Sequence, residues 1–315
     1  IYTLSLHDAL PIYELRLIFK AIVTLLFLWW VIFKVDWRAA WESLQAVRWY
    51  HLLIYAILYY LGLFFSAIKW KTLASVKGFD YSVVKYFNLY YSATFVNNFA
   101  PSFIGGDTYK TYKLGKDKKR FKLAASSVIM DRVVGLVGAM ILAVLFFGLN
   151  CRLLYQNTLV TCIILGIIFG VLVFSVILKF PWCYCFLSQR IRTMINKLTS
   201  EIKSYHNNSN ALIRSILLSF WFNLFGVVLA NLVLFWALGV EISWRNYLSV
   251  IFLIGIISST PITINNVGIK EWAYIVFFGL FDVSATAMVT VVLLSRFLQM
   301  FFSFLAWPIF IKNEK

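Results

Sequence analysis

Long apolar runs constrain this chain more than any other feature of its sequence. A membrane-spanning helix needs about 20 mostly apolar residues. Six runs reach or approach that length: Leu17–Val35, Tyr50–Ile68, Leu123–Leu149, Thr158–Leu178, Ile216–Val240 and Thr286–Ile311. Hydrophobic residues make up 62% of the chain and charged residues only 13%, whereas soluble domains are roughly half apolar and a quarter charged. No soluble core buries so much apolar surface, so we expect an all-α polytopic membrane protein with about six full spans.

The N-terminal residues are treated separately. Residues 1–12, IYTLSLHDALPI, look like translated sequencing-adapter read-through, and we expect them to be non-native. Residues 13–315 are predicted to form a single transmembrane domain. Within it, the segment Asp36–Trp49 mixes tryptophans with charges, which is typical of an interfacial amphipathic helix or of an ordinary connector helix.

Basic residues predict the sidedness of the loops. The formal net charge is +16, from 29 Lys and Arg against 13 Asp and Glu. Lys and Arg number four in Lys69–Lys85, seven in Gly105–Lys122 and six in Lys179–Arg214, against one each in Asn150–Asn157 and Glu241–Arg245. By the positive-inside rule the three basic loops and the C-terminus are cytoplasmic. The run Lys110–Lys122 is interpreted as a topology signal that contacts an anionic lipid surface, and no nucleic-acid partner is expected.

Two further apolar stretches each end at a proline. The first, Tyr86–Ile104, is flanked by two loops that are both predicted to be cytoplasmic, so it must enter the membrane and return. The second, Tyr247–Ile264, is followed by a shorter apolar piece, Trp272–Phe281. Together they must enter and return from the external side. Two oppositely oriented re-entrant or broken helices are typical of an inverted repeat. The predicted repeat halves are residues 50–150 and 213–311.

The proline segments align without gaps. Pro101 overlies Pro261, the pair Gly105-Gly106 overlies Asn265-Asn266, and Lys110 overlies Lys270. Gly and Asn tolerate left-handed or unwound backbone, and such backbone at membrane depth must be buried or line a polar cavity. The alternative is a kink that serves packing only. The predicted broken-helix residues are Pro101, Gly105, Gly106, Pro261, Asn265, Asn266 and Gly268.

Charged residues inside the spans are the candidate functional groups. A helix that begins near Phe121 places Arg132 about 16 Å along its axis, near the middle of a roughly 30 Å core. Arg296 reaches a similar depth from the other side. Such charges are costly unless paired or hydrated, so they are functional candidates. We predict a positive midplane cavity for substrate, formed by Arg132, Arg296, Lys110 and Lys270, balanced by Asp107, Asp131 and Glu271, with amide groups from Asn97 and Asn98.

A structural role for the same charges is the alternative. Asp131 and Arg132 would then pair with each other, or across the repeat, and hold the two halves together. Asn97 and Asn98 would cap the broken helix. Asp131 shares a stripe with Ala124, Ser127, Gly135 and Gly138, a small polar face suited to the interior of the bundle. The scattered His and Cys residues suggest no metal site and no cofactor.

At these residues the chain resembles the lysylphosphatidylglycerol synthase transmembrane-region family, also called the flippase-like domain family. The first family signature resembles N-x3-P-x3-GGD followed by a basic residue, and an acidic-Arg-x2-Gly element follows it. The second signature resembles P-x3-GG-x-G-x-R-E, and Asn265 and Asn266 replace its glycine pair. The matching residues are Asn97, Pro101, Gly105, Gly106, Asp107, Lys110, Asp131, Arg132, Gly135, Pro261, Gly268, Lys270 and Glu271.

The resemblance implies a multi-pass protein of the plasma (inner) membrane. It also implies a lipid flippase or transporter that moves a phosphate-bearing lipid: a phospholipid, an aminoacyl-phospholipid or a polyprenyl-phosphate-linked lipid. Family members with a soluble aminoacyltransferase domain make lysylphosphatidylglycerol. This chain has no room for that domain after Lys315, so we expect it not to be an enzyme. The alternatives are a membrane-embedded transferase with Asp107 or Glu271 as general base, and a scaffold for a cell-envelope synthesis complex.

Overall fold

The computed structural model describes residues 22–99, 105–116, 119–158, 160–166, 169–170, 189–206, 208–260 and 262–314. Every regular element in these ranges is helical, which confirms the all-α polytopic fold class. Several predictions lie outside the described residues: the segment 1–12, both prolines Pro101 and Pro261, the beginning of the first predicted span and the end of the span predicted over Thr158–Leu178.

In the described ranges, four long helical stretches are apolar enough to cross a membrane. They match four of the six predicted spans, and a shorter apolar helix, Ile22–Lys34, lies within a fifth. Apolar side chains all around these helices suit a lipid environment better than a single amphipathic face would. The long stretches are α3 (Trp49–Val76), α6 (Phe121–Phe147) with η1 (Gly148–Asn150), α10 (Ser209–Phe222) with η3 (Asn223–Leu229) and α11 (Ala230–Ala237), and α14 (Ala285–Phe304) with α15 (Trp307–Glu314).

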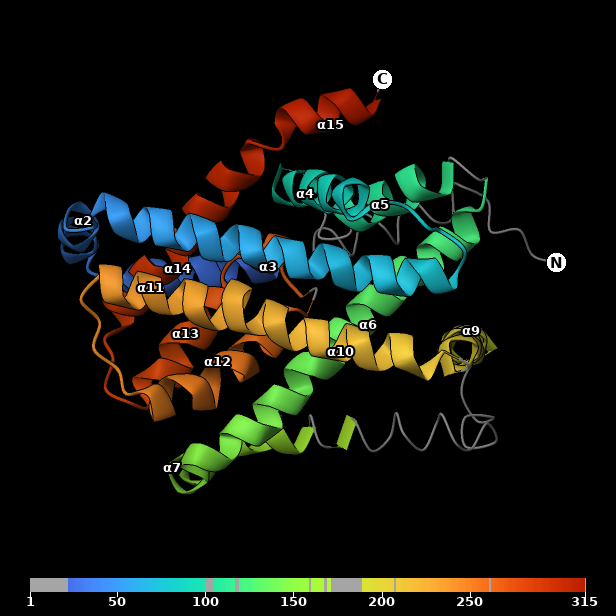
Figure 1. Cartoon of the computed structure of the whole chain (residues 1–315). Coiled ribbons are helices and arrows are strands. Elements are labelled where there is room, and N and C mark those ends of the chain that lie inside the picture. The colour runs from blue at the N-terminus through green and yellow to red at the C-terminus, as the bar shows by residue number, and fades with distance from the viewer. Residues whose placement is uncertain are drawn as a thin grey trace.

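The two proline segments form helical hairpins. In the first, α4 (Val83–Phe99) packs against α5 (Gly105–Lys116), and in the second, α12 (Trp244–Ser258) packs against α13 (Ile269–Gly279), with the short turn η4 (Ile264–Asn266) between them. Figure 1 shows the α4–α5 hairpin extending from the end of the long helices where α9 lies, and the α12–α13 hairpin from the end where α2 lies. The hairpins therefore enter the bundle from opposite ends. The inverted repeat stays a prediction, which this arrangement favours.

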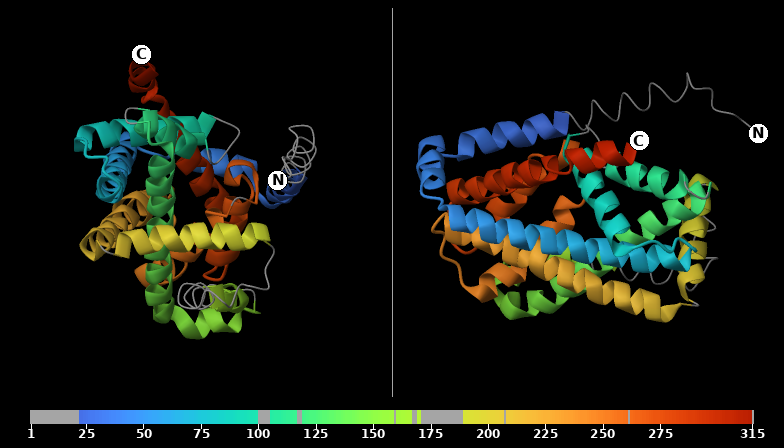
Figure 2. Two further views of the ribbon diagram at one scale, coloured as in Figure 1. Left: turned by 90° about the vertical axis from the view of Figure 1, so that its right-hand side faces the viewer. Right: turned by 45° about the horizontal axis from the view of Figure 1, so that its top comes forward.

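Loops with the same predicted sidedness lie at the same end of the bundle. Asn150 donates to Asn246 at 2.8 Å, and Arg245 donates to the carbonyl of Leu149 at 3.0 Å, so the two weakly basic loops meet. At the other end, Lys77 lies 2.6 Å from Glu201, which ties the end of α3 to α9 (Gln189–His206). Figure 2 shows α9 lying crosswise over this end of the bundle.

The peripheral helices complete the two ends. Asp36 caps α2 (Trp37–Gln45) by accepting from the backbone amides of Arg38 and Ala39, as expected for a capping aspartate. This confirms a helix within the segment predicted as interfacial or connecting. The short helix α7 (Cys151–Gln156) follows η1. The helix Ile22–Lys34 packs through Val31 against Val289 of α14, and Figure 2 shows the two helices side by side.

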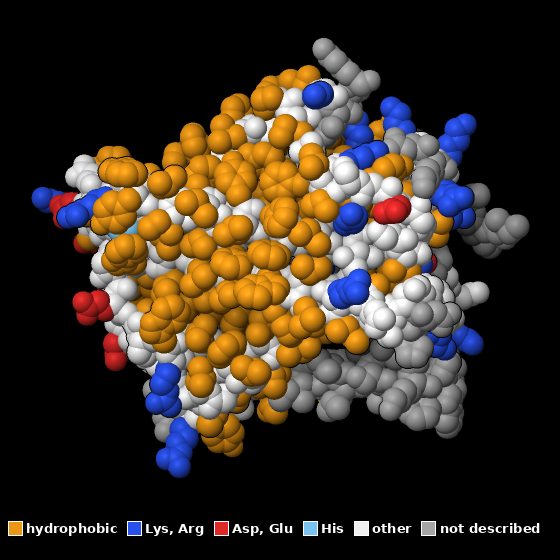
Figure 3. Space-filling model, viewed as in Figure 1, with side chains coloured by type: hydrophobic (Ala, Val, Ile, Leu, Met, Phe, Trp, Pro, Cys, Tyr) orange, Lys and Arg blue, Asp and Glu red, His pale blue; other side chains and the backbone are white. Residues whose placement is uncertain are grey.

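The surface carries a belt of apolar side chains. Figure 3 shows hydrophobic side chains over the middle of the long helices and Lys and Arg side chains at their ends, most densely where α5 and α9 lie. A broad exposed apolar band is unusual for a soluble monomer, and a bilayer would cover it. The distribution agrees with a multi-pass membrane protein.

The structure corrects the prediction that the basic segment Gly105–Lys122 is a loop. The first half of this segment is helical, because α5 continues to Lys116. Lys110 and Lys113 are only 3% and 8% exposed, so these two lysines do not contact a lipid surface. Gly106 permits the close packing of this hairpin, since a Cβ there would lie 2.3 Å from the carbonyl oxygen of Ala93.

Candidate functional site

A buried carboxylate and two buried lysines form the centre of the first polar cluster. Asp131, in the middle of α6, is 2% exposed. Lys69 from α3 lies 3.2 Å from its Oδ1 atom, and Lys110 from α5 lies 3.5 Å from its Oδ2 atom. The aromatic ring of Tyr90 lies 4.5 Å from the Lys110 ammonium group and adds a cation–π contact. Burial of these charges is tolerable because each ammonium faces a carboxylate.

A second carboxylate extends the cluster toward a cavity. Asp107, in the first turn of α5, lies 3.0 Å from Lys110 and 2.9 Å from Nε of Arg132. Its position near the N-terminus of α5 also suits the helix dipole. The side chain of Arg132 is 45% exposed, in contrast with the lysines behind it. The predicted pairing of Asp131 with Arg132 is therefore not present: the arginine pairs with Asp107, and Asp131 pairs with lysines.

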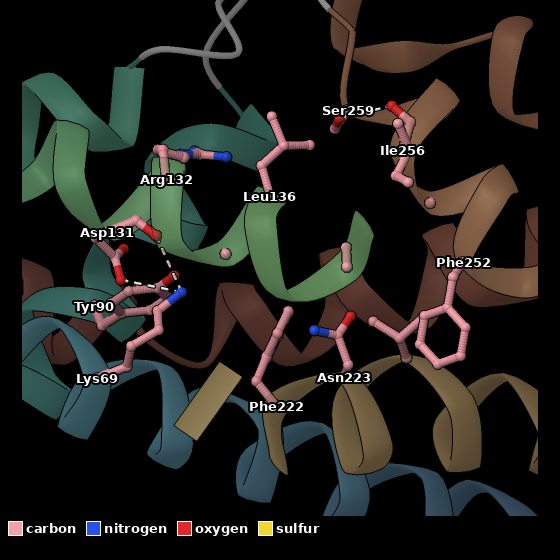
Figure 4. Close-up of a pocket in the computed structure, with 14 residues that line it drawn as sticks. Lys69, Tyr90, Asp131, Arg132, Leu136, Phe222, Asn223, Phe252, Ile256 and Ser259 are labelled. Carbon is pink, nitrogen blue, oxygen red and sulfur yellow. Dashed lines mark hydrogen bonds and ion pairs between the residues drawn. The ribbon is translucent and has the colours of Figure 1, made fainter. Parts of the chain in front are cut away.

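Arg132 lies at the wall of a cavity of about 400 Å³. Figure 4 shows Lys69, Tyr90, Asp131 and Arg132 on one side of this cavity and Phe252, Ile256 and Ser259 on the other. Phe222 and Asn223, at the junction of α10 and η3, lie below them in the same view. We name this the Arg132 cavity. It combines one exposed guanidinium with mostly apolar walls, as small-molecule sites in proteins commonly do.

The charges of the second half form a separate cluster. Arg296 of α14 donates through Nε to Glu271 at 2.7 Å, and through its two terminal nitrogens to the carbonyls of Asn265 and Asn266 at 3.1 and 2.6 Å. Glu271 also accepts from the amide of Gly268 at 2.7 Å. All three guanidinium nitrogens of Arg296 are thus engaged, two with the link between α12 and α13 and one with the first turn of α13. We name this arrangement the Arg296 clamp.

The backbone of the second link is left-handed, as the sequence predicts. Asn265 and Asn266 have φ values of 49° and 57°, and Gly268 has φ of 87°. Asparagine tolerates this region better than other non-glycine residues, which explains how an amide pair serves in place of glycine. Gly105 and Gly106 differ, because they form the first turn of α5 with helical backbone. The prediction of left-handed backbone at that pair is wrong.

The two acid–arginine pairs correspond in position. Asp107 is the third residue of α5 and Glu271 the third residue of α13, and each pairs with an arginine 25 residues later. The gapless overlay of the prolines is therefore out of register beyond the link, because Asp107 follows Pro101 by six residues whereas Glu271 follows Pro261 by ten, with η4 in the longer stretch. In the corrected register Lys110 no longer corresponds to Lys270.

The single midplane cavity predicted from the sequence is not what the structure shows. Arg132, Lys110, Asp107 and Asp131 lie together, but no ion pair among the described residues joins them to Arg296, Lys270 or Glu271. Lys270 lies 3.4 Å from the hydroxyl of Ser295 and lines another cavity.

The two predicted asparagines connect elements of the bundle. Asn97 accepts from the amide of Gly106 at 2.8 Å and so ties α4 to the start of α5. Asn98 donates to the hydroxyl of Ser303 at 2.8 Å and so ties α4 to α14. Their contacts match the capping and packing interpretation of these residues, and neither lines the Arg132 cavity.

Lys69 is the main residue that the sequence analysis missed. It was counted in a cytoplasmic loop, but α3 continues to Val76 and buries it to 3% exposure. Its helical spacing was the available signal, since Gly62, Ser66 and Lys69 recur at steps of four and three on one face of an apolar helix.

Comparison with known proteins identifies a family. The family model for the "Lysylphosphatidylglycerol synthase TM region" matches residues 17–306, which is most of the chain. Searches of curated proteins and of solved structures found no match. The matched range includes both polar clusters and both hairpins.

Proposed function

Because the chain belongs to the lysylphosphatidylglycerol synthase TM region family, we propose that it moves a phosphate-bearing lipid across the plasma membrane, with the headgroup in the Arg132 cavity. The family supports a role in lipid handling within a membrane. The Arg132 cavity adds the chemistry that an anionic headgroup requires.

The observation that carries this proposal is the excess positive charge beside the cavity. Three cations, Lys69, Lys110 and Arg132, face two carboxylates, Asp107 and Asp131. Among the residues that the structure describes, one positive charge is in excess in this cluster, and Arg132 is the most exposed member of the cluster that lines the cavity. A guanidinium binds phosphate oxygens in a bidentate geometry, and a charge at membrane depth is expected to serve function.

An adjacent apolar cavity suits the acyl chains. It measures about 450 Å³ and is lined by side chains such as Leu142, Trp221 and Leu248, with Phe252 on its wall and on the wall of the Arg132 cavity. Contact with apolar side chains keeps acyl chains out of water, which is energetically favourable. We infer that the acyl chains occupy this apolar cavity while the headgroup reaches Arg132.

The environment of the carboxylates favours transport over a transferase reaction. A general base needs an oxygen positioned to accept a proton from substrate. Asp107 accepts from Arg132 and forms an ion pair with Lys110, and Glu271 accepts from Arg296 and the amide of Gly268. The end of the bundle that carries α5 and α9 is assigned to the cytoplasm, because Lys and Arg gather there.

Replacing Arg132 tests the proposal. We expect Arg132→Gln to lower translocation of a fluorescent phosphatidylglycerol in proteoliposomes by roughly tenfold to a hundredfold, since a hydrogen bond to a charged group contributes about 1.5–3 kcal/mol. The protein should still fold, because Asp107 keeps its contact with Lys110. Lys122→Gln, at an exposed lysine of the same helix, is the matched control and should leave the rate unchanged. Wild-type translocation by Arg132→Gln would rule out the proposed headgroup site.

A further inference from the structure

A second cavity lies beside Lys270. It measures about 290 Å³ and is bordered by elements from both halves of the chain. Its polar lining groups come from five side chains besides the lysine: Tyr59, Asn231, Ser258, Tyr274 and Gln299. We name this the Lys270 cavity. Amide and hydroxyl groups around one cation are a lining suited to a charged, hydrogen-bonding ligand.

Lys270 differs from the lysines of the first cluster, because it contacts no carboxylate of the described part of the chain. No ion pair of Lys270 occurs among the described residues, whereas Lys69 and Lys110 each contact Asp131. The neighbouring Glu271 is engaged by Arg296. The hydroxyl of Ser295 at 3.4 Å and the ring of Tyr274 at 5.9 Å are long contacts for an ammonium group. A cation in such surroundings gains strongly from an anionic ligand.

A buried hydroxyl gives independent support for a ligand. The Oγ atom of Ser258, at the end of α12, is shielded from solvent and has no hydrogen-bond partner within the described ranges. Ser258 lines the same cavity as Lys270. Buried polar atoms without partners are rare and call for an explanation. A phosphate oxygen held by Lys270 would provide an acceptor for such a donor.

We propose that the Lys270 cavity is a second binding site for the phosphate group of a membrane phospholipid. The Arg296 clamp explains why Lys270 carries this role: in the second half of the chain the arginine is used to hold the link, and the lysine is left to meet the ligand. The first half has the reverse arrangement, with paired lysines and an exposed arginine.

The two cavities share a wall. Phe222, Val227 and Gly255 line both of them. A Cβ at Gly255 would meet no atom within 4 Å, so the backbone of α12 leaves open space there. Val227 belongs to the π-helical segment η3, and π-helical turns occur often at functional sites. We assign Gly255 to the route by which a headgroup passes between the cavities, an assignment that rests on the proposed transport function.

Lipid binding stoichiometry tests the second site without relying on transport. Native mass spectrometry of the detergent-solubilised protein with dihexanoyl phosphatidylglycerol should show two bound lipids per wild-type chain. Dihexanoylglycerol, which lacks phosphate, should not bind at either site. We expect Lys270→Met to retain one lipid, Arg132→Gln to retain one, and the double variant to retain none. Lys122→Met is the matched control and should retain both.

Two results of this experiment would overturn the second site. One is an unchanged lipid count, with unchanged affinities, in folded Lys270→Met. The other is a protein in which Lys270 is required for binding of inorganic phosphate but not for binding of lipid. A free phosphate ion would then be the ligand. Failure of the Arg132→Gln transport test, with two lipids still bound by the wild type, would remove the proposed function and leave the second site standing.

A bulky residue at Gly255 tests the route. We expect Gly255→Leu to keep both lipids bound in the native mass spectrum and to lower translocation in proteoliposomes about tenfold or more, because its side chain projects into the shared wall. Leucine is a good helix former, so α12 should remain intact. Gly279→Leu, at another glycine with open space around it, is the matched control. Wild-type translocation by a folded Gly255→Leu protein would overturn the route.

Discussion

An Asp131→Asn protein is expected to lose about 3–5 kcal/mol of its free energy of unfolding, the usual cost of removing one partner from a buried ion pair. Lys69 and Lys110 would remain buried, with side-chain exposures of 4% and 3%. Lys110 would keep Asp107 as a partner, but Lys69 contacts no other carboxylate among the described residues. The loss therefore comes mainly from one uncompensated ammonium group between α3 and α6.

A double-mutant cycle measures this effect. Unfolding in detergent micelles should show that Asp131→Asn combined with Lys69→Met recovers most of the lost stability, because the cation and its carboxylate are then both removed. Asp282→Asn is the matched control at an exposed aspartate; its φ of 60° is one that asparagine tolerates, so it should change little. Additive losses in the double variant would contradict the ion pair.

The same double variant separates structural charge from transport charge. It leaves the excess of one positive charge beside the cavity unchanged, so translocation should return together with stability. Arg132→Gln should show the opposite behaviour, with a stable protein and slow translocation. In a scaffold protein, function would depend neither on the Asp131–Lys69 pair nor on Arg132. Wild-type function in both variants would favour that alternative.

An Arg296→Met protein is also expected to lose about 3–5 kcal/mol of its free energy of unfolding, because a buried carboxylate loses its cationic partner. Glu271 is 3% exposed and would keep only the amide of Gly268 as a partner. The carbonyls of Asn265 and Asn266 would lose their donors at the same time. Opening of the link between α12 and α13 should follow, because left-handed asparagines are costly unless the surroundings hold them.

Hydrogen exchange and a lysine variant test the Arg296 clamp. Amides of η4 and the start of α13 should exchange faster in Arg296→Met, while those of α3 should be less affected. Arg296→Lys should not restore stability, since one ammonium cannot reproduce the planar fork that reaches Glu271 and two carbonyls. Arg245→Gln, which removes a single exposed contact with Leu149, is the control with a small effect. Full stability of Arg296→Lys would contradict the clamp.

Much of the fold could be predicted because membrane solvation acts on each segment separately. A stretch such as Trp49–Val76 is apolar over the length of a bilayer wherever it packs, so its existence as a helix follows from composition and length. The same holds for the breaks at the ends of α4 and α12, which small and amide residues mark in the sequence. The loops that basic residues grouped together also lie together, as Lys77 and Glu201 show.

The partners of the charged residues could not be predicted, because they depend on distances between helices. Asp131 and Arg132 are neighbours in sequence, yet the helical turn of about 100° per residue buries the side chain of Asp131 against two lysines and leaves that of Arg132 exposed beside Asp107. The register of the two proline segments was wrong for a similar reason. The similar residue types after the two prolines suggested an alignment without gaps. The second link is longer, so Glu271 occupies the position in α13 that Asp107 occupies in α5.

The sequence by itself determined that this chain is a helical membrane protein, where its helices break, and that Asp131, Arg132 and Arg296 lie within apolar stretches, because those properties depend on local composition. Only the tertiary structure decided that these charges separate into two clusters, that Lys69 belongs to the first, and that Arg296 is held by the link while Lys270 faces a cavity. Charge pairing falls off with distance on the scale of a few ångströms, and only packed helices set distances of that size.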